Sequence, residues 1–179
     1  MSSSSRGIEG LLTTRLSLRR PTPADVGAIL AIVGDPRTCE HNRSELITGP
    51  AQAEELYRLW DRQWRAHGLG YLVVRRRSTE ETVGFCGVKV VQFGAAEALN
   101  LYYRLSPSAW GEGIASEAAA AVVAWAVAAR PAIPLIARVS RGNLASQRVA
   151  TKIGLHRAPH LDLDGPDGPE LLYTTTPAE

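Results

Sequence analysis

The chain has 179 residues, of which 45% are hydrophobic and 21% are charged, and its formal net charge is +2. This length is sufficient for one domain with its own core, and the small net charge argues against a general nucleic-acid coat. No apolar run approaches the roughly 20 residues of a membrane-spanning helix, and Cys39 and Cys86 match no metal or redox spacing, so we expect a cytoplasmic protein with reduced thiols.

The N-terminal part is predicted to contain a tail, a strand and a helix. Residues 1–10 include a serine run with no apolar segment behind it, so we expect a disordered tail and not a signal peptide. Alternation over residues 12–20 predicts a strand with Leu16 and Leu18 on one face. A helix then follows, because apolar residues recur at helical spacing: Val26, Ile29, Leu30 and Val33.

The middle of the chain is predicted to form a helix and an antiparallel meander. The helix covers residues 51–66 and has one apolar stripe: Ala53, Leu56, Trp60 and Trp64. Turn-forming residues separate the three strands that follow, at residues 71–75, 83–91 and 99–105. Gly84 and Gly87 inside the second of these strands indicate either a bulge or a close approach of another backbone segment.

The C-terminal part alternates between helices and strands. The first helix has a predicted buried stripe: Ile114, Ala118, Ala121 and Trp125. A strand at Leu135–Val139 leads to a helix at Leu144–Lys152, which Asn143 caps and Gly154 ends. The chain closes with a hairpin, whose loop and return strand are residues 164–169 and 171–175.

The order of these elements predicts the fold class. A strand, a helix and a strand after Leu99 imply a parallel pair with a right-handed crossover in an otherwise antiparallel sheet. We therefore predict a mixed α/β fold, with about six or seven strands and about four helices on both faces of the sheet. No internal repeat or linker interrupts residues 11–179, which are expected to form a single domain.

A glycine-containing loop follows the strand that ends at Leu105, and Gly111-Glu112-Gly113 opens the next helix. Unpaired N–H groups in the first turn of a helix, together with its dipole, attract a phosphate, and glycines let the phosphate approach the backbone. A nicotinamide dinucleotide site is disfavoured because Ser116 stands where its third glycine would be, and no phosphate loop of the nucleotide triphosphatase type occurs. Taken alone, the two glycines also fit a plain tight turn.

Three segments of the chain carry a longer pattern. Residues 103–118 read YRLSPSAWGEGIASEA, residues 143–155 read NLASQRVATKIGL, and residues 14–19 read TRLSLR. These segments resemble the patterns Y-x-L-x-P-x-x-W-G-x-G-x-A-T-E-A, N-x-x-S-x-x-V-x-x-K-x-G-F and T-x-R-L-x-L-R of the GNAT acetyltransferase superfamily, in particular its branch of ribosomal-protein N-terminal acetyltransferases. Ser116 replaces the commoner threonine, and Leu155 replaces the usual phenylalanine.

The resemblance implies a site for acetyl-CoA as co-substrate. Backbone N–H groups at the helix start would hold its pyrophosphate: Trp110, Gly111, Glu112, Gly113, Ile114 and Ala115. The backbone N–H of Leu105 would polarise the thioester carbonyl and stabilise the oxyanion that forms from it. The pantetheine arm would lie between two splayed parallel strands, of which one ends at Leu105 and the other begins near Leu135.

Two side chains of the next helix are also implicated. A helix that begins after Asn143 places Ser146 on one face with Val149 and Ile153. The resemblance implies that Asn143 and Ser146 contact coenzyme A and that Ser146 protonates the departing thiolate. The alternative is that Asn143 only caps the helix and that Ser146 bonds back to the cap, and both roles can coexist.

The sequence does not identify a single general base. Superfamily members often carry an acidic residue on the strand before the phosphate loop, which points to Glu97 or its neighbour Asn100, although Asn100 stands where the branch often has glutamate. Deprotonation near neutral pH costs about 1–1.5 kcal/mol for an α-amino group and about 4–5 kcal/mol for a lysine amine. We therefore expect an α-amino group or a small primary amine as acceptor. The resemblance implies that the segment between the first two helices lines its pocket, where Asn42, Arg43 and Glu45 would contact it, together with Asn100 and Tyr102 on the strand.

We expect the amine to attack the bound thioester directly, because no cysteine or serine lies beside a histidine to support a covalent enzyme intermediate. The alternatives are the same enzyme with another donor such as succinyl-CoA, and a non-catalytic CoA-binding regulatory module. We expect no metal ion, because Cys39-Glu40-His41 is too compressed for a site and the aspartates around Gly165 lack the spacing of a calcium loop. No nucleic-acid or membrane partner is expected, and the protein is expected to be a monomer or a homodimer.

Overall fold

The computed structural model describes residues 10–175, so nearly all of the tail predicted for residues 1–10 lies outside the described residues. Nine strands form one sheet in the order β1-β2-β3-β4-β5-β6-β9-β7, with β8 paired to β9. The strands are β1 (Leu11–Leu12), β2 (Leu16–Arg19), β3 (Tyr71–Arg76), β4 (Thr82–Phe93), β5 (Ala96–Leu105), β6 (Leu135–Ser140), β7 (His156–Arg157), β8 (Leu163–Gly165) and β9 (Gly168–Thr174). The α-helices are α1 (Val26–Val33), α2 (Pro50–His67), α3 (Ile114–Ala129) and α4 (Leu144–Lys152).

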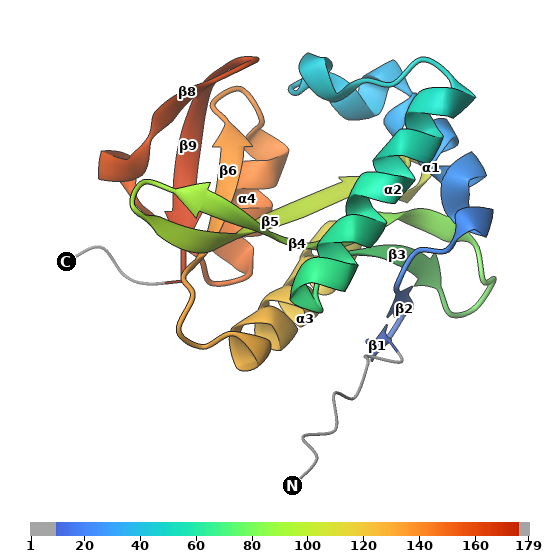
Figure 1. Cartoon of the computed structure of the whole chain (residues 1–179), viewed down its shortest axis with the longest axis horizontal. Helices are drawn as coiled ribbons and strands as arrows, with labels where there is room; N and C mark the ends of the chain where they lie inside the picture. Colours follow the sequence, from blue (N-terminus) through green and yellow to red (C-terminus); the bar gives the residue numbers. More distant parts are fainter. Residues whose placement is uncertain (1–9, 176–179) are drawn as a thin grey trace, which may run out of the picture.

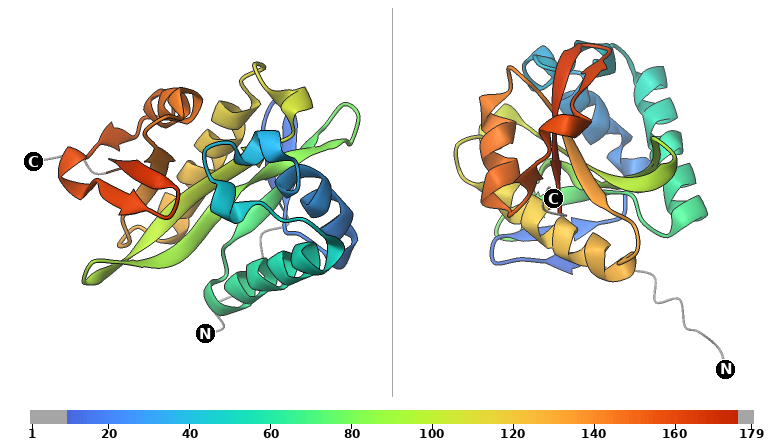
Figure 2. Two further views of the ribbon diagram at one scale, coloured as in Figure 1. Left: turned by 90° about the horizontal axis from the view of Figure 1, so that it is seen from above. Right: turned by 90° about the vertical axis from the view of Figure 1, so that its left-hand side faces the viewer.

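The sheet lies between two layers of helices (Figures 1 and 2). Helices α1 and α2 pack on one face against Val73 and Phe85, whereas α3 and α4 pack on the other against Leu72 and Leu101. All neighbouring strands are antiparallel except β5 and β6, which are parallel. The predicted mixed fold with one parallel pair is confirmed. The structure has nine strands and not the predicted six or seven, because the first strand is divided into β1 and β2 and the segment before β9 forms two short strands, β7 and β8.

Strand β4 carries both features that its glycines predicted. The register with β3 shifts between Val74 and Arg75, which is the irregularity of a bulge. A Cβ atom at Gly84 would lie 2.4 Å from the carbonyl oxygen of Arg104, and one at Gly87 would lie 2.3 Å from that of Gly70. The neighbouring strands therefore approach β4 to a distance that only glycine permits.

Two local predictions were wrong in detail. The first predicted strand is divided into β1 and β2, because the chain turns back after Leu12 and Leu11 pairs with Leu18. The buried face of α3 does not include Ala121 and Trp125, which were predicted to belong to it. Its buried residues are Ile114, Ala118, Ala119, Val122 and Ala126. Apolar residues lie all around this alanine-rich helix, so periodicity could not select the face that packs on the sheet.

The parallel pair of strands is short. Its register contains Leu99 opposite Leu135 and Asn100 opposite Ile136, after which the two strands diverge. Strand β6 then pairs along its length with β9 instead (Figure 1). The second half of β5 therefore has a neighbouring strand on one side only, and the sheet opens there.

Candidate active site

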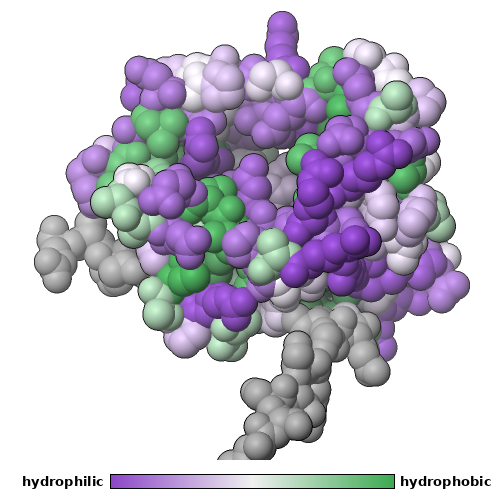
Figure 3. Space-filling model, in the orientation of Figure 1, coloured by the Kyte–Doolittle hydropathy of each residue, from purple (hydrophilic) through white to green (hydrophobic). Residues whose placement is uncertain are grey.

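The opening beside β5 is one continuous cleft of about 760 Å³. Its walls come from the second half of β5, the start of α3, strand β6 with the start of α4, and the loop between α1 and α2. Figure 3 shows the molecule hollowed in this region, with hydrophilic side chains around the opening. The cleft brings together most of the predicted site residues: Asn42, Asn100, Tyr102, Leu105, Trp110, Gly111, Gly113, Ile114, Ala115, Asn143 and Ser146.

Backbone donors of β5 face into this cleft. The N–H of Ser106 donates to the carbonyl of Val83 at 2.8 Å, which sets the alternation of the ladder with β4. By this alternation, the N–H groups of Tyr103 and Leu105 point away from β4, toward the side that β6 has left. The N–H of Tyr103 is therefore a second free donor, beside the predicted N–H of Leu105. Sequence reasoning missed it because the alternation of a strand does not show at which residue the neighbouring strand diverges.

The glycine loop has the backbone that an anion site needs. Gly111 and Gly113 have φ values of 78° and 77°, in the left-handed region that glycine adopts without strain. Gly113 is the N-cap of α3 and no side chain caps the helix, so the N–H groups of its first turn are open to a ligand. The indole Nε1 of Trp110 donates to the carbonyl of Leu105 at 3.1 Å and fixes the entry to the loop.

The Glu112 side chain does not line the cleft, so only its backbone can contribute to an anion site. Arg76 holds the Glu112 carboxylate with two hydrogen bonds of 2.9 and 2.8 Å. Arg15 donates to the carbonyl of Glu112 at 2.9 Å and to the Glu117 carboxylate at 2.6 Å. The shape of the loop therefore depends on two arginines from outside the cleft, which sequence reasoning did not identify.

Asn143 caps α4, as predicted, because its Oδ1 accepts a hydrogen bond of 3.0 Å from the backbone N–H of Ser146. Ser146 is half-buried in the cleft wall, and its backbone carbonyl accepts from the Tyr103 hydroxyl at 3.1 Å. Burial raises the pKa of Tyr103 to about 12. The Tyr103 hydroxyl is therefore neutral at physiological pH.

The structure does not bring Glu97 to the site. Glu97 is exposed near the start of β5, opposite Gln92, and lines neither of the two cavities described here. Asn100 does line the cleft, and its buried Oδ1 has no hydrogen-bond partner within residues 10–175. An N–H group of a bound molecule would satisfy that oxygen.

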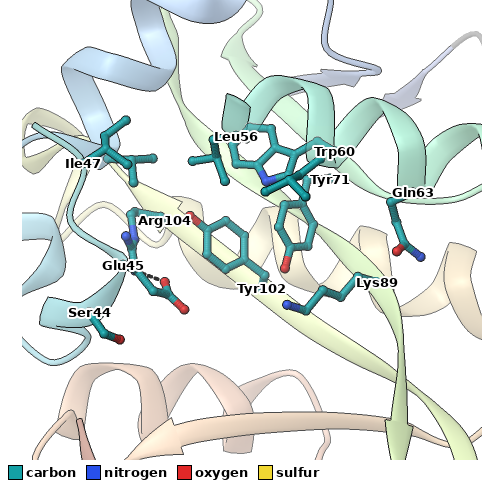
Figure 4. Close-up of a pocket in the computed structure, with 12 residues that line it drawn as sticks. Ser44, Glu45, Ile47, Leu56, Trp60, Gln63, Tyr71, Lys89, Tyr102 and Arg104 are labelled. Atoms are coloured by element: carbon teal, nitrogen blue, oxygen red, sulfur yellow. Dashed lines mark hydrogen bonds and ion pairs between the residues drawn. The ribbon is translucent and has the colours of Figure 1, made fainter. Parts of the chain in front are cut away.

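A second cavity of about 440 Å³ lies between α2 and the face of the sheet that α2 covers (Figure 4). Its wall is aromatic: the Tyr71 and Tyr102 rings stack at 4.4 Å, and the Trp60 ring meets Tyr71 edge-on at 5.3 Å. Burial raises the pKa values of both tyrosines, so their hydroxyls are neutral donors. The two cavities share four lining residues and therefore adjoin: Glu45, Lys89, Tyr102 and Arg104.

Arg104 and Glu45 form an ion pair between the cavities. Arg104 donates to the Glu45 carboxylate at 2.6 Å and to the sulfur of Cys39 at 2.9 Å, and its guanidinium lies 5.5 Å from the centre of the Tyr102 ring. Burial lowers the pKa of Arg104, but Tyr102, Glu45 and Cys39 outweigh it and the net shift is upward. Arg104 therefore stays charged and holds Glu45 at the boundary of the cleft.

The two walls of the cleft also meet directly. The backbone N–H of Ser44, in the loop between α1 and α2, donates to the Asp167 carboxylate at 2.9 Å. Asp167 lies in the turn between β8 and β9, more than a hundred residues further along the chain. This contact bridges the cleft between its N-terminal and C-terminal sides.

The thiols lie outside the cleft. Cys39 and Cys86 are free and buried, and burial raises the pKa of Cys86. Within residues 10–175, no group of three or more His, Cys, Asp or Glu side chains is arranged to hold a metal ion. Of the helices in the same residues, none is long and apolar enough to cross a membrane.

Comparisons with known proteins agree with this geometry. The family described as acetyltransferase (GNAT) domain matches residues 15–156. The uncharacterized protein YkkB of Bacillus subtilis (strain 168) is 27% identical over 147 residues, which cover 82% of this chain and 84% of that protein.

Solved structures are similar over nearly the whole chain. The acetyltransferase from Agrobacterium tumefaciens str. C58 is 27% identical with a TM-score of 0.76, covering 93% of this chain and 94% of that one. RimL, a ribosomal L7/L12 alpha-N-protein acetyltransferase in complex with coenzyme A, is 16% identical with a TM-score of 0.76, covering 92% of this chain and 95% of that one. At 16% identity, the likeness to RimL is one of fold.

Proposed function

The chain belongs to the acetyltransferase (GNAT) domain family, and from this premise we propose that it transfers the acetyl group of acetyl-CoA to a primary amine by direct attack within a ternary complex. The observation that carries the proposal is the row of backbone donors on β5, which faces the cleft and leads into the uncapped start of α3. A long, flexible thioester with a pyrophosphate at one end fits that arrangement.

The pyrophosphate of acetyl-CoA is assigned to the segment from Trp110 to Ala115. The positive φ values of Gly111 and Gly113 support this assignment, because they turn successive N–H groups toward one point. The dipole of α3 adds a partial positive charge at the same place. The fold likeness to a coenzyme A complex is consistent with it.

The thioester is assigned to the backbone of β5. The N–H of Leu105, with that of Tyr103 beside it, would polarise the thioester carbonyl and stabilise the oxyanion that develops on attack. As the C–N bond forms, the C–S bond breaks and its electron pair goes to sulfur. Ser146 is assigned the role of proton donor to that thiolate, with Asn143 holding the helix start in place.

The amine is assigned to the side of the cleft next to Tyr102. Glu45 takes the role considered for Glu97, because Glu45 lies on both cavities and Glu97 on neither. Its carboxylate would attract the ammonium form and receive the proton that the amine loses, directly or through water. Asn42 and Asn100 complete the acceptor side, and an α-amino or small primary amine remains the favoured acceptor because it loses its proton more easily than lysine does.

The test of this function is the release of coenzyme A thiol from acetyl-CoA with a panel of amines and peptides. Direct attack predicts that double-reciprocal plots against the two substrates intersect, whereas parallel lines would indicate a covalent enzyme intermediate and overturn the mechanism. Succinyl-CoA in the same assay tests the alternative donor. Tight binding of coenzyme A without thiol release for any amine would favour the non-catalytic alternative.

A further inference from the structure

The charged side chains on the acceptor side of the site are unevenly paired, and the proposed reaction does not require this. Arg104 pairs with Glu45 through one carboxylate oxygen, Oε2, whereas Lys89 forms no ion pair or hydrogen bond with the described residues. Lys89 is one of two lysines in a chain with eighteen arginines, and it lines both cavities. One positive charge is therefore left unbalanced at their boundary.

Neutral donors gather at the same end of the aromatic cavity. The Nε2 atom of Gln63 is buried and has no hydrogen-bond partner in residues 10–175, although Gln63 lines the cavity. In Figure 4 the Gln63 side chain points from α2 toward the strand that carries Lys89, and the Tyr71 hydroxyl points toward the Lys89 amino group. A cation with two neutral donors beside it can hold an anion, and Asn100, which pairs with Lys89 across the strands, offers its Oδ1 only as an acceptor.

The opposite end of the cavity carries the negative group. Figure 4 shows Glu45 and Lys89 on opposite sides of the Tyr102 ring. The Tyr102 ring lies between them, and Ile47 and Leu56 add apolar surface to the aromatic lining of the cavity (Figure 4). The cavity volume of about 440 Å³ lies within the range of small-molecule sites, which is about 300–1,000 Å³.

We propose that the acceptor is a small primary amine that carries a carboxylate at the far end of an apolar body. Lys89 binds the carboxylate with Gln63 and Tyr71, the aromatic wall receives the apolar body, and the amine lies on the Glu45 side, from which it reaches the thioester. This inference rests on the proposed function and specifies its acceptor. A protein N-terminus lacks a carboxylate at that position, so it is the disfavoured acceptor.

The experiment uses three benzylamines of nearly the same shape: 4-(aminomethyl)benzoate, 4-(aminomethyl)benzamide and 4-methylbenzylamine. Initial rates with acetyl-CoA are measured at low ionic strength, because an exposed lysine is screened by salt. We expect kcat/KM to be about tenfold higher for the benzoate than for the two neutral amines, which is the scale of one charge-assisted contact. The difference is expected in KM, because Lys89 binds the acceptor and takes no part in proton transfer.

Lys89→Met removes the charge and keeps an unbranched side chain. It is expected to lower kcat/KM for the benzoate about tenfold and to change that for the neutral amines less than twofold, and Lys89→Arg is expected to restore most of the loss. Lys152→Met is the matched control, because Lys152 is exposed in the last turn of α4 and lines neither cavity. Gln63→Leu is expected to act on the benzoate in the same direction as Lys89→Met, by a smaller factor.

Calorimetry of 4-(aminomethyl)benzoate in the presence of coenzyme A separates this inference from the proposed function. Binding that Lys89→Met weakens, without acetyl transfer to any amine, would support the anion site and overturn the function. Acetyl transfer with equal kcat/KM for all three amines, unchanged in Lys89→Met, would overturn the anion site and leave the function standing. Neither binding nor transfer of the benzoate, with transfer to a peptide N-terminus, would also overturn the inference.

Discussion

The hydroxyl of Tyr103 donates a hydrogen bond of 3.1 Å to the backbone carbonyl of Ser146, so a side chain of β5 holds the first turn of α4 across the opening of the sheet. This bond therefore connects Tyr103, whose N–H faces the cleft, with Ser146, which is assigned to protonate the thiolate. Because β5 and β6 diverge at this place, this side-chain bond connects the two sides of the opening where no strand pairing does.

Tyr103→Phe should loosen this connection without emptying the core. We expect a loss of about 0.5–1.5 kcal/mol in the free energy of unfolding, the usual net value of one hydrogen bond, and weaker binding of coenzyme A. Urea unfolding and calorimetry measure the two effects. Tyr57→Phe is the control, because the Tyr57 hydroxyl forms no hydrogen bond with the described residues and lines neither cavity. Equal effects of the two substitutions would show that the Tyr103 bond does not hold the cleft.

Ser146→Ala should lower kcat more than it weakens the binding of acetyl-CoA, because a proton donor acts on a charge that exists only in the transition state. We expect the lower end of the range of about 10²–10⁴-fold that general acids contribute, since water can replace the hydroxyl. Steady-state kinetics and calorimetry separate the two quantities. Ser78→Ala, in an exposed turn, is the control. Unchanged turnover would leave Ser146 as part of the helix cap only.

Gly111→Asp should abolish most of the affinity for acetyl-CoA, because it places a carboxylate at the proposed pyrophosphate site. The positive φ of Gly111 adds backbone strain to this effect, so a control with the same strain is needed. Gly94→Asp provides it: Gly94 has φ 61°, open space around its Cβ position like Gly111, and a place in the β4–β5 turn away from the cleft. Calorimetry should show a large loss for the first variant only, and similar affinities for both would refute the assignment of the loop.

The pH dependence of the rate tests the base and the acceptor together. Because a carboxylate such as that of Glu45 is a much weaker base than an amine, turnover should still rise with the fraction of free amine and level off near the acceptor's own pKa, about 8 for an α-amino group and well above that for lysine. Glu97→Gln should not change the profile because Glu97 lies outside both cavities, whereas Glu45→Gln should lower kcat/KM for the amine. A plateau near pH 6–7 on a lysine-only peptide, lost in Glu97→Gln, would contradict this and make Glu97 the base.

Glu117 should make the stability of the protein depend on pH. Burial raises the pKa of Glu117, but hydrogen bonds from Thr13 and Arg15 outweigh it, and the net pKa lies below the ordinary value of 4.5. A carboxyl group with a lowered pKa in the folded state stabilises the protein above its unfolded pKa, and this stabilisation is lost as the pH falls through the folded value.

The free energy of unfolding should therefore fall below about pH 4.5 more steeply in the wild type than in Glu117→Gln, which has already lost this contribution. Urea unfolding at several pH values measures the difference. Glu97→Gln is a suitable control, because the Glu97 carboxylate is exposed and bonds no described residue. Parallel curves for the wild type and Glu117→Gln would mean that the contacts of Glu117 contribute nothing to stability.

Local features of the fold were predictable because they depend on a few neighbouring residues. Helix α4 has the predicted bounds, since Asn143 caps it and Gly154, with φ 86°, ends it. The buried stripe of α2 was also predicted, because large apolar residues alternate with charged ones there and leave a single apolar face. Helix α3 lacks that contrast between apolar and charged residues, and for this reason the prediction of its buried face was wrong.

The sequence by itself determined the family motifs, the turn glycines at residues 111 and 113 and the cap of α4, because these rest on backbone conformation and spacing within a few residues. The resemblance implied that β5 and β6 diverge and that the N–H of Leu105 is exposed, but only the tertiary structure decided that the divergence begins after Asn100, which opens the N–H of Tyr103 to the cleft as well. It also decided that Glu45, and not Glu97, lies at the boundary of the two cavities. Both outcomes follow from the packing of segments far apart in the chain, and no local pattern specifies which of them meet.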